Sequence, residues 1–201
     1  FNAVTRGSAP VLPAAPLCQP APMNQANKPV RRLHIGGHER REGWEIFDAL
    51  PREGVNHRGD AGDLSRFADG TFAELYASHV LEHFDFREAV PRVLKEWHRV
   101  LQAGGRLFVS VPDMERLCHL YLTPGLSPEA RLKIMWMMFG AHADAYDYHH
   151  VGFNADYLGS ALSEAGFTNI QRVLDFGVFK KDTSTMVFLG VPISVNLTAT
   201  R

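Results

Sequence analysis

The stretch RVLQAGGRLFVSVPD, residues 99–113, favours an α/β fold because it holds the end of a helix, a glycine pair and a strand in that order. The segment GRLFVSVP (105–112) is apolar on both of its faces, which is typical of a central strand buried in a parallel sheet. Gly104 and Gly105 predict the stop of the preceding helix. A helix followed at once by a buried strand is a unit from which parallel sheets are built.

The helix before this turn is predicted from one apolar stripe. Its members recur with the 3.6-residue period of an α-helix, and they are Phe86, Val90, Val93, Leu94, Trp97 and Leu101. Asp85, with Glu88 three residues later, predicts a capping pair at the start. Pro91 lies inside the stripe, so we expect a kink or a later start there.

Short apolar segments elsewhere predict six more strands, at 30–35, 44–49, 54–60, 72–78, 169–176 and 186–199. Two further helices are predicted, one opening at Ser127-Pro128-Glu129 and one capped by Asn154. The last two strands are joined without a helix, so we expect an antiparallel pair, with Pro192 marking a bulge or an edge. The sequence therefore predicts an α/β fold: a single doubly wound, mostly parallel seven-stranded sheet with a C-terminal antiparallel hairpin.

Composition bounds the function. The chain has 201 residues, 45% of them hydrophobic, and a net charge of -1, which gives no case for nucleic acid or an anionic membrane as partner. Residues 1–29 hold six of the twelve prolines without any helical or strand period, so they read as a linker or disordered arm before a domain over 30–201. The two cysteines, Cys18 and Cys118, are too few for a disulfide framework and favour a reducing, cytoplasmic location.

Six pieces of the chain carry a resemblance. The segments LHIGG, EIFDAL, GDAGDL, YASHVLEHF, RVLQAGGRLFVSVPD and LSEAGF, spread over roughly 30–200, resemble the class I S-adenosylmethionine-dependent methyltransferases. Among these the chain is similar to small bacterial members often associated with surface-glycan synthesis. The family commonly has RVLKPGGxLxxxVP where residues 99–112 stand here. The resemblance implies a Rossmann-like fold, S-adenosylmethionine as cofactor and methyl transfer as the reaction.

The resemblance also implies where the methionine part of the cofactor lies. Gly36 and Gly37 end the first strand, and their lack of side chains lets the backbone approach a ligand. A plain tight turn is the alternative reading. His38 stands where the family often has another small residue, and it is counted with the cofactor-binding residues. Only six residues separate Gly37 from Trp44, too few for a regular crossover helix.

Carboxylates are expected to hold the nucleoside. Asp48 ends the second strand, where an acid can accept both ribose hydroxyls, although an exposed loop acid would look the same in sequence. Asp63 falls where the family binds the adenine amino group, and Leu64 would cover the ring. Asp63 could instead cap a helix. Asp60 is the competing candidate for the adenine contact.

The stretch YASHVLEHF (76–84) can be read in two ways. His79-x-x-Glu82-His83 spells a zinc-peptidase helix in inverted form, which would make the protein a zinc hydrolase. The strand pattern ahead of it breaks such a helix, so no metal is predicted. His79 then lies where the family places residues near the reacting methyl, and both Ser78 and His79 are expected to bind the cofactor. Glu82 and His83 are expected to make local hydrogen bonds that shape the loop.

Methyl transfer to an alcohol requires alignment and a base. Histidine suits that role near neutral pH, and His149, His150 and His79 are the predicted catalytic residues, with Asp113 as a secondary candidate. The predicted acceptor is a small molecule or a glycan-linked group methylated at oxygen. A non-catalytic scaffold that has lost the cofactor is the alternative. The cluster WMMF (136–139) is expected in the core or in a subunit contact, so a homodimer is also considered.

Overall fold

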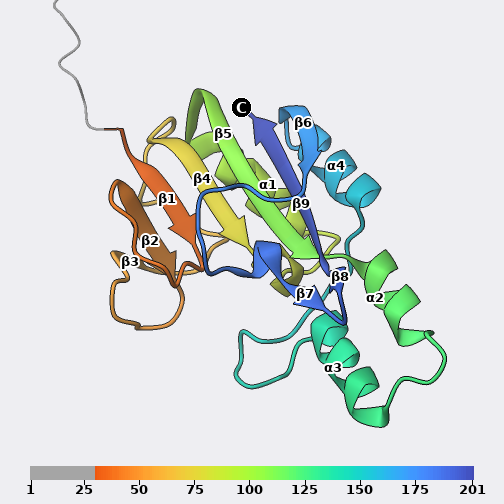
Figure 1. The fold of residues 1–201 in the computed structure, drawn as a ribbon. Coiled ribbons are helices and arrows are strands. Elements are labelled where there is room, and N and C mark those ends of the chain that lie inside the picture. Colours follow the sequence, from red (N-terminus) through yellow and green to blue (C-terminus); the bar gives the residue numbers. More distant parts are fainter. Residues whose placement is uncertain (1–29) are drawn as a thin grey trace, which may run out of the picture.

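The computed structural model describes residues 30–201, and the arm predicted for 1–29 lies outside the described residues (Figure 1). Seven strands form one sheet in the order β3-β2-β1-β4-β5-β9-β6. Their bounds are β1 (Arg32–Ile35), β2 (Trp44–Asp48), β3 (His57–Arg58), β4 (Phe72–Ser78), β5 (Leu101–Pro112), β6 (Thr168–Val173) and β9 (Ser194–Thr200). Strands β1 to β5 are parallel, whereas β9 runs antiparallel to β5 and β6. The predicted fold class is confirmed.

The order of the strands reverses between β1 and β4. The chain runs outward from β1 to β2 and β3, and then returns to place β4 on the other side of β1. Ligands of open α/β sheets bind at the carboxyl ends of the strands beside such a reversal. No helix joins β1 to β2, as the short spacing after Gly37 predicted.

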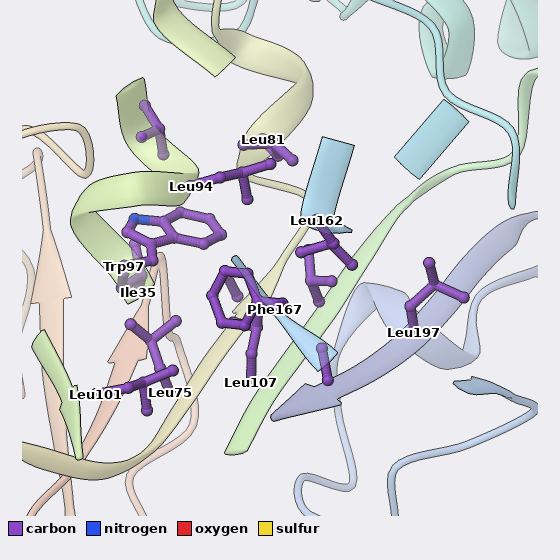
Figure 2. Packing of buried hydrophobic residues seen from close by; sticks show 14 of the residues in the cluster. Ile35, Leu75, Leu81, Leu94, Trp97, Leu101, Leu107, Leu162, Phe167 and Leu197 are labelled. Atoms are coloured by element: carbon purple, nitrogen blue, oxygen red, sulfur yellow. The ribbon is translucent and has the colours of Figure 1, made fainter. Parts of the chain in front are cut away.

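Helices α1 (Ala89–Val100) and α4 (Ala155–Glu164) pack on one face of the sheet. Figure 2 shows the side chains of Trp97 and Leu162 pointing from these helices toward Leu75, Leu107 and Leu197 of the strands. The opposite face is covered by the segment after β6, which crosses the front of the sheet in Figure 1 and contributes part of a second, aromatic cluster. That cluster contains Tyr76, Phe108, Phe176 and Phe179.

The helix predicted before the glycine turn is shorter than its stripe suggested. Helix α1 begins at Ala89, so Pro91 falls in its first turn, where its missing N–H costs nothing. Phe86 is 47% exposed and lies outside the helix. Gly104 and Gly105 do not stop the helix, because β5 already begins at Leu101 and the glycines lie in an irregular part of that strand.

One strand prediction was wrong in detail, and one helix was missed. The strand expected over 186–199 is broken into β7 (Val187–Phe188), β8 (Val191–Pro192) and β9. Strands β7 and β8 form a separate hairpin, turned at Leu189 and Gly190, which both have positive φ. Helix α2 (Met114–Tyr121) was not predicted at all. It directly follows β5 and is capped by Asp113.

Helix α3 (Pro128–Phe139) packs on α2 through Ile134 but leaves much of its apolar surface uncovered. Of the WMMF cluster, Met137 and Met138 pack against the core residues around Ile134, whereas Trp136 and Phe139 are exposed, as is the preceding Met135. A subunit contact through these residues stays a prediction. Among residues 30–201, no helix is both long and apolar enough to cross a bilayer.

His34 of β1 is buried in the aromatic cluster. Its ring stacks on Phe179 with the centroids 4.0 Å apart and meets the edge of Tyr76 at 5.0 Å. Within the described chain its Nδ1 has no hydrogen-bond partner. Burial, with a smaller effect of His38, lowers the pKa of His34 to about 3.

This buried imidazole should make the fold sensitive to acid. Because the folded pKa lies below the unfolded value, protonation favours the unfolded chain, and stability is lost as pH falls from about 6.5 toward 3. At pH 5, His34 alone lowers the free energy of unfolding by about 2 kcal/mol relative to pH 8. His34→Leu should shrink the difference in unfolding free energy between pH 8 and pH 5 by that amount, as measured by urea denaturation. An equal loss in both proteins would contradict the assignment.

Candidate cofactor-binding site

A cavity of about 500 Å³ lies at the carboxyl ends of the parallel strands. Residues at the ends of β1, β2 and β4 line it, together with the loop after β3 and the 3-10 helix η1 (Leu81–His83). The loop 144–150, which connects α3 to α4, closes one side. The size and position are those of a small-molecule or cofactor site in an open α/β sheet.

Gly36 lines this cavity where β1 ends. Its φ of 70° is in the left-handed region, and a Cβ there would lie 2.7 Å from Cγ2 of Val80. Glycine is therefore required, and it leaves a bare stretch of backbone facing the cavity. Gly37 lies elsewhere: its Cβ would fall 2.5 Å from the His34 ring, so it serves packing, and it does not line the cavity.

Asp48 lines the cavity from the end of β2 and is 5% exposed, so it is no exposed loop acid. Its Oδ1 accepts a hydrogen bond from the backbone N–H of Leu50 at 2.7 Å, and its Oδ2 accepts one from Nη2 of Arg52. These contacts fix the carboxylate, and each oxygen keeps a further lone pair for a ligand. His38 also lines the cavity and lies against Nη1 of Arg52 at 2.6 Å. The sequence reading missed Arg52, whose spacing four residues after Asp48 was the available signal.

The loop after β3 places Asp60, and not Asp63, at the cavity. Asp60 lines it and accepts a hydrogen bond from the N–H of Gly62 at 2.7 Å. Asp63 is exposed, lies outside the lining and accepts from the N–H of Ser65 at 3.0 Å within a turn, and because no helix begins there it does not cap one either. Leu64 is fully buried in the core and cannot cover a ring in the cavity. The prediction that Asp63 and Leu64 contact the adenine is therefore not supported, since neither residue lines the cavity.

His79 lies beside two cavities. It lines the first one and also a second, of about 460 Å³, which Ser78 and Lys181 help to line. Ser78 lies only on this second side, where its Oγ is 2.7 Å from Oγ1 of Thr183. Nε2 of His79 is hydrogen-bonded to Oγ of Ser194 at 2.9 Å. Burial, followed by the neighbouring histidines, lowers the pKa of His79 to about 3, so its ring is neutral.

The two adjacent histidines of the loop point to different places. His150 lines the cavity, and its backbone N–H donates to the carbonyl oxygen of Glu82 at 2.8 Å. His149 does not line it, and its Nδ1 donates to the carbonyl oxygen of Met138 at 3.3 Å. Burial lowers the pKa of His149 to about 4. The structure therefore brings only His150 of this pair to the cavity.

Asp113 has a structural place. It caps α2 by accepting from the N–H of Arg116 at 3.2 Å, and Nη2 of Arg172 donates to its Oδ2 at 3.1 Å. It does not line the cavity. Asp113 is therefore not in position to act on a ligand there, contrary to the secondary prediction.

The inverted zinc-peptidase helix is not formed. His79 has φ of 53°, and only three residues of the stretch are helical, so His79 and His83 do not share a helix face. His83 does shape the loop, since its Nδ1 donates to the carbonyl oxygen of Tyr148 at 3.1 Å. The Glu82 side chain is fully buried, and no described residue hydrogen-bonds to either of its oxygens. Burial raises its pKa to about 8. In the described structure Glu82 therefore makes its loop hydrogen bond through its backbone carbonyl oxygen, to the N–H of His150, and none through its side chain.

Comparison with known proteins agrees with this geometry. Residues 46–109, about a third of the chain, match the family model of the methyltransferase domain. No curated protein matches the chain. A solved S-adenosylmethionine-dependent methyltransferase from Archaeoglobus fulgidus superimposes with a TM-score of 0.54 at 16% identity, over 86% of each chain.

Two other solved structures are similar in fold. One is named as a "possible histamine N-methyltransferase" from Thermotoga maritima, with a TM-score of 0.51 at 17% identity over 85% of this chain and 81% of that one. The other is the methyltransferase CalH in complex with S-adenosylhomocysteine, with a TM-score of 0.51 at 16% identity over 85% of this chain and 51% of that one. Residues 46–109 therefore match a methyltransferase domain, and the chain as a whole has the Rossmann-like fold of these solved methyltransferases.

Proposed function

We propose that the protein transfers a methyl group from S-adenosylmethionine to a hydroxyl oxygen of a small-molecule or glycan-linked acceptor. One observation carries the proposal: Gly36, Asp48 and Asp60 follow three adjacent parallel strands and line one cavity beside the reversal of strand order. A bare backbone and two acceptor carboxylates at these places suit a nucleoside that ends in an amino acid.

The residues fit this cofactor part by part. Asp48, already fixed by Leu50 and Arg52, would accept from the ribose hydroxyls. Asp60 would accept from the adenine amino group, and the backbone at Gly36, where a Cβ would lie only 2.7 Å from Cγ2 of Val80, would take the methionine part. When bound, the cofactor supplies an electrophilic methyl group on a sulfonium.

His150 is our candidate for the base. It is exposed to the cavity, whereas His79 and His149 are held by Ser194 and Met138. An imidazole there would take the proton of an acceptor hydroxyl as the new bond to carbon forms. His150 is the only support for oxygen as the methylated atom. The fold itself does not favour oxygen, because one similar structure is named as a possible N-methyltransferase. Loop 144–150, with Tyr146 and Tyr148, would exclude water from the aligned groups.

Calorimetric titration with S-adenosylhomocysteine tests the proposed function. We expect saturable binding at one site per chain, with Kd near the micromolar range, about −8 kcal/mol. Asp63→Asn is the matched control, because Asp63 lies in the same loop as Asp60 but outside the cavity, and it should bind like the wild type. A folded protein that binds no S-adenosylhomocysteine would instead support the non-catalytic scaffold.

We also propose that the protein is cytoplasmic and forms a homodimer. Cys118 carries an exposed free thiol, which suits a reducing cytoplasm. The exposed Met135, Trp136 and Phe139 on α3 would suit a contact between two copies of the chain. Sedimentation of the purified protein would decide between a monomer and a dimer.

A further inference from the structure

A fully buried carboxylate without partners lies behind the cavity wall. Glu82 of η1 has no exposed surface, and neither side-chain oxygen has a hydrogen-bond partner among residues 30–201. A buried carboxylate is costly unless it is paired, hydrogen-bonded or bound to a metal. The described structure offers Glu82 neither an arginine nor a lysine. What faces it instead is a group of imidazoles.

Two histidines from distant parts of the sequence converge on this carboxylate. One ligand atom each from Glu82, His83 and His149 lies within 4.8 Å of the other two. Nε2 of His149 is 4.0 Å from Oε1 of Glu82, and the rings of His83 and His149 meet edge to face with centroids 4.9 Å apart. Tetrahedral zinc ligands lie about 3.4 Å from one another, so a small contraction would complete such a site.

The hydrogen bonds of the His83 and His149 rings leave Nε2 of each ring free to bind a metal ion. Nδ1 of His83 lies 3.1 Å from the carbonyl oxygen of Tyr148, and Nδ1 of His149 lies 3.3 Å from that of Met138. A carbonyl only accepts, so both Nδ1 atoms carry the proton and both Nε2 atoms keep a lone pair. A backbone carbonyl on the far nitrogen is the usual support of a metal-binding histidine.

A third imidazole, that of His79, also turns an unprotonated nitrogen toward Glu82. Oγ of Ser194 donates to the carbonyl oxygen of Thr183 at 2.8 Å, so it accepts from Nε2–H of His79. The unprotonated Nδ1 of His79 then faces Oε1 of Glu82 at 3.7 Å. Lone pairs therefore meet the buried carboxylate from two sides, an arrangement that is stable only with a positive charge or a proton between them.

We propose that Glu82, His83 and His149 bind a divalent transition-metal ion, with zinc as the expected occupant. Two neutral imidazoles and one carboxylate are a donor set that zinc accepts, and three protein ligands leave a coordination position open. Of the three residues, His83 lines the cavity, so the open position lies at the cavity wall. There the ion would bind and orient an acceptor oxygen and lower its pKa. This last role rests on the proposed function, whereas the metal site does not.

Metal binding can be measured without any substrate. Tag-free full-length protein, stripped with a chelator, is titrated with zinc against a chromophoric chelator, and we expect one tightly bound ion per chain. Glu82→Gln preserves volume and His149→Ala removes one ligand, and each should weaken zinc binding by at least about 100-fold. His119→Ala, an exposed histidine on α2, is the matched control and should bind zinc like the wild type. Cobalt in place of zinc should give the intense visible bands of a four- or five-coordinate ion.

The outcomes separate the metal site from the proposed function. S-adenosylhomocysteine binding without stoichiometric zinc would overturn the metal site and leave the methyltransferase proposal intact, with a proton on Glu82 in place of the ion. Zinc binding that survives both Glu82→Gln and His149→Ala would overturn it as well, since the ion would then be held by other residues. Zinc binding without S-adenosylhomocysteine binding would support the site and contradict the proposed function.

Discussion

Replacing Asp48 with alanine should weaken the binding of S-adenosylhomocysteine by at least about 100-fold. The carboxylate is the acceptor proposed for two ribose hydroxyls, and a hydrogen bond to a charged group contributes about 1.5–3 kcal/mol. It is also held in place before the ligand arrives, by the N–H of Leu50 and by Arg52, so little ordering is needed on binding. Calorimetric titration of the wild type and the variant gives the ratio directly.

The comparison needs a folded variant and a milder change. Asp48→Asn keeps the volume and an oxygen that can accept from Leu50, and it should bind with an affinity between those of the wild type and Asp48→Ala. Circular dichroism should show both variants folded. If Asp48→Ala binds as tightly as the wild type, Asp48 does not contact the nucleoside and the cofactor site lies elsewhere.

Trp97→Ala should lower the free energy of unfolding by about 3–5 kcal/mol, the range for removing a large aromatic side chain from a core. Trp97 is fully buried in α1, against the sheet (Figure 2). Its Nε1–H donates to the carbonyl oxygen of Ala61 at 2.9 Å, next to Asp60. The variant should therefore also bind S-adenosylhomocysteine more weakly, because the loop that places Asp60 loses its anchor. Urea denaturation followed by circular dichroism measures the first effect.

Two substitutions separate the contributions. Trp97→Phe keeps most of the apolar contact and loses the hydrogen bond, so it should cost about 1–3 kcal/mol. Trp136→Ala on α3 removes the same side chain where it is 47% exposed, and at protein concentrations where the chain is monomeric it should change stability by no more than about 0.5 kcal/mol. Similar losses for Trp97→Ala and Trp136→Ala would mean that burial does not distinguish the two tryptophans.

The predictions that held are those where one side-chain period decides the element. Strand β4 coincides with the predicted 72–78, and the stripe of Val90, Val93, Leu94 and Trp97 is the buried face of α1. Predictions failed where tertiary contacts decide. Leu101 fits the helical stripe, yet it pairs with Phe72 as the first residue of β5.

The site shows the same division. Asp48 could be predicted because the end of a strand fixes its place. Which of Asp60 and Asp63 reaches the cavity depends only on how the loop turns, and the local sequence does not encode that turn. The burial of Glu82 depends on a loop more than sixty residues away, since His149 and His150 approach it from beyond α3. No pattern within YASHVLEHF could have indicated that contact. His149 and His150 likewise have equal claims in sequence, and only the backbone turns one of them to the cavity.

The position of β9 has a consequence for how the chain folds. β9, residues 194–200, lies between β5 and β6, so these two strands cannot join the same sheet until residues 194–200 have been synthesised. Until then β5 ends the sheet with an unpaired edge, and a growing chain on the ribosome carries that edge exposed. Completion of the sheet by β9 then depends on contacts between residues that are far apart in sequence, and such contacts form slowly. Binding of the emerging chain by a chaperone would matter most during this interval.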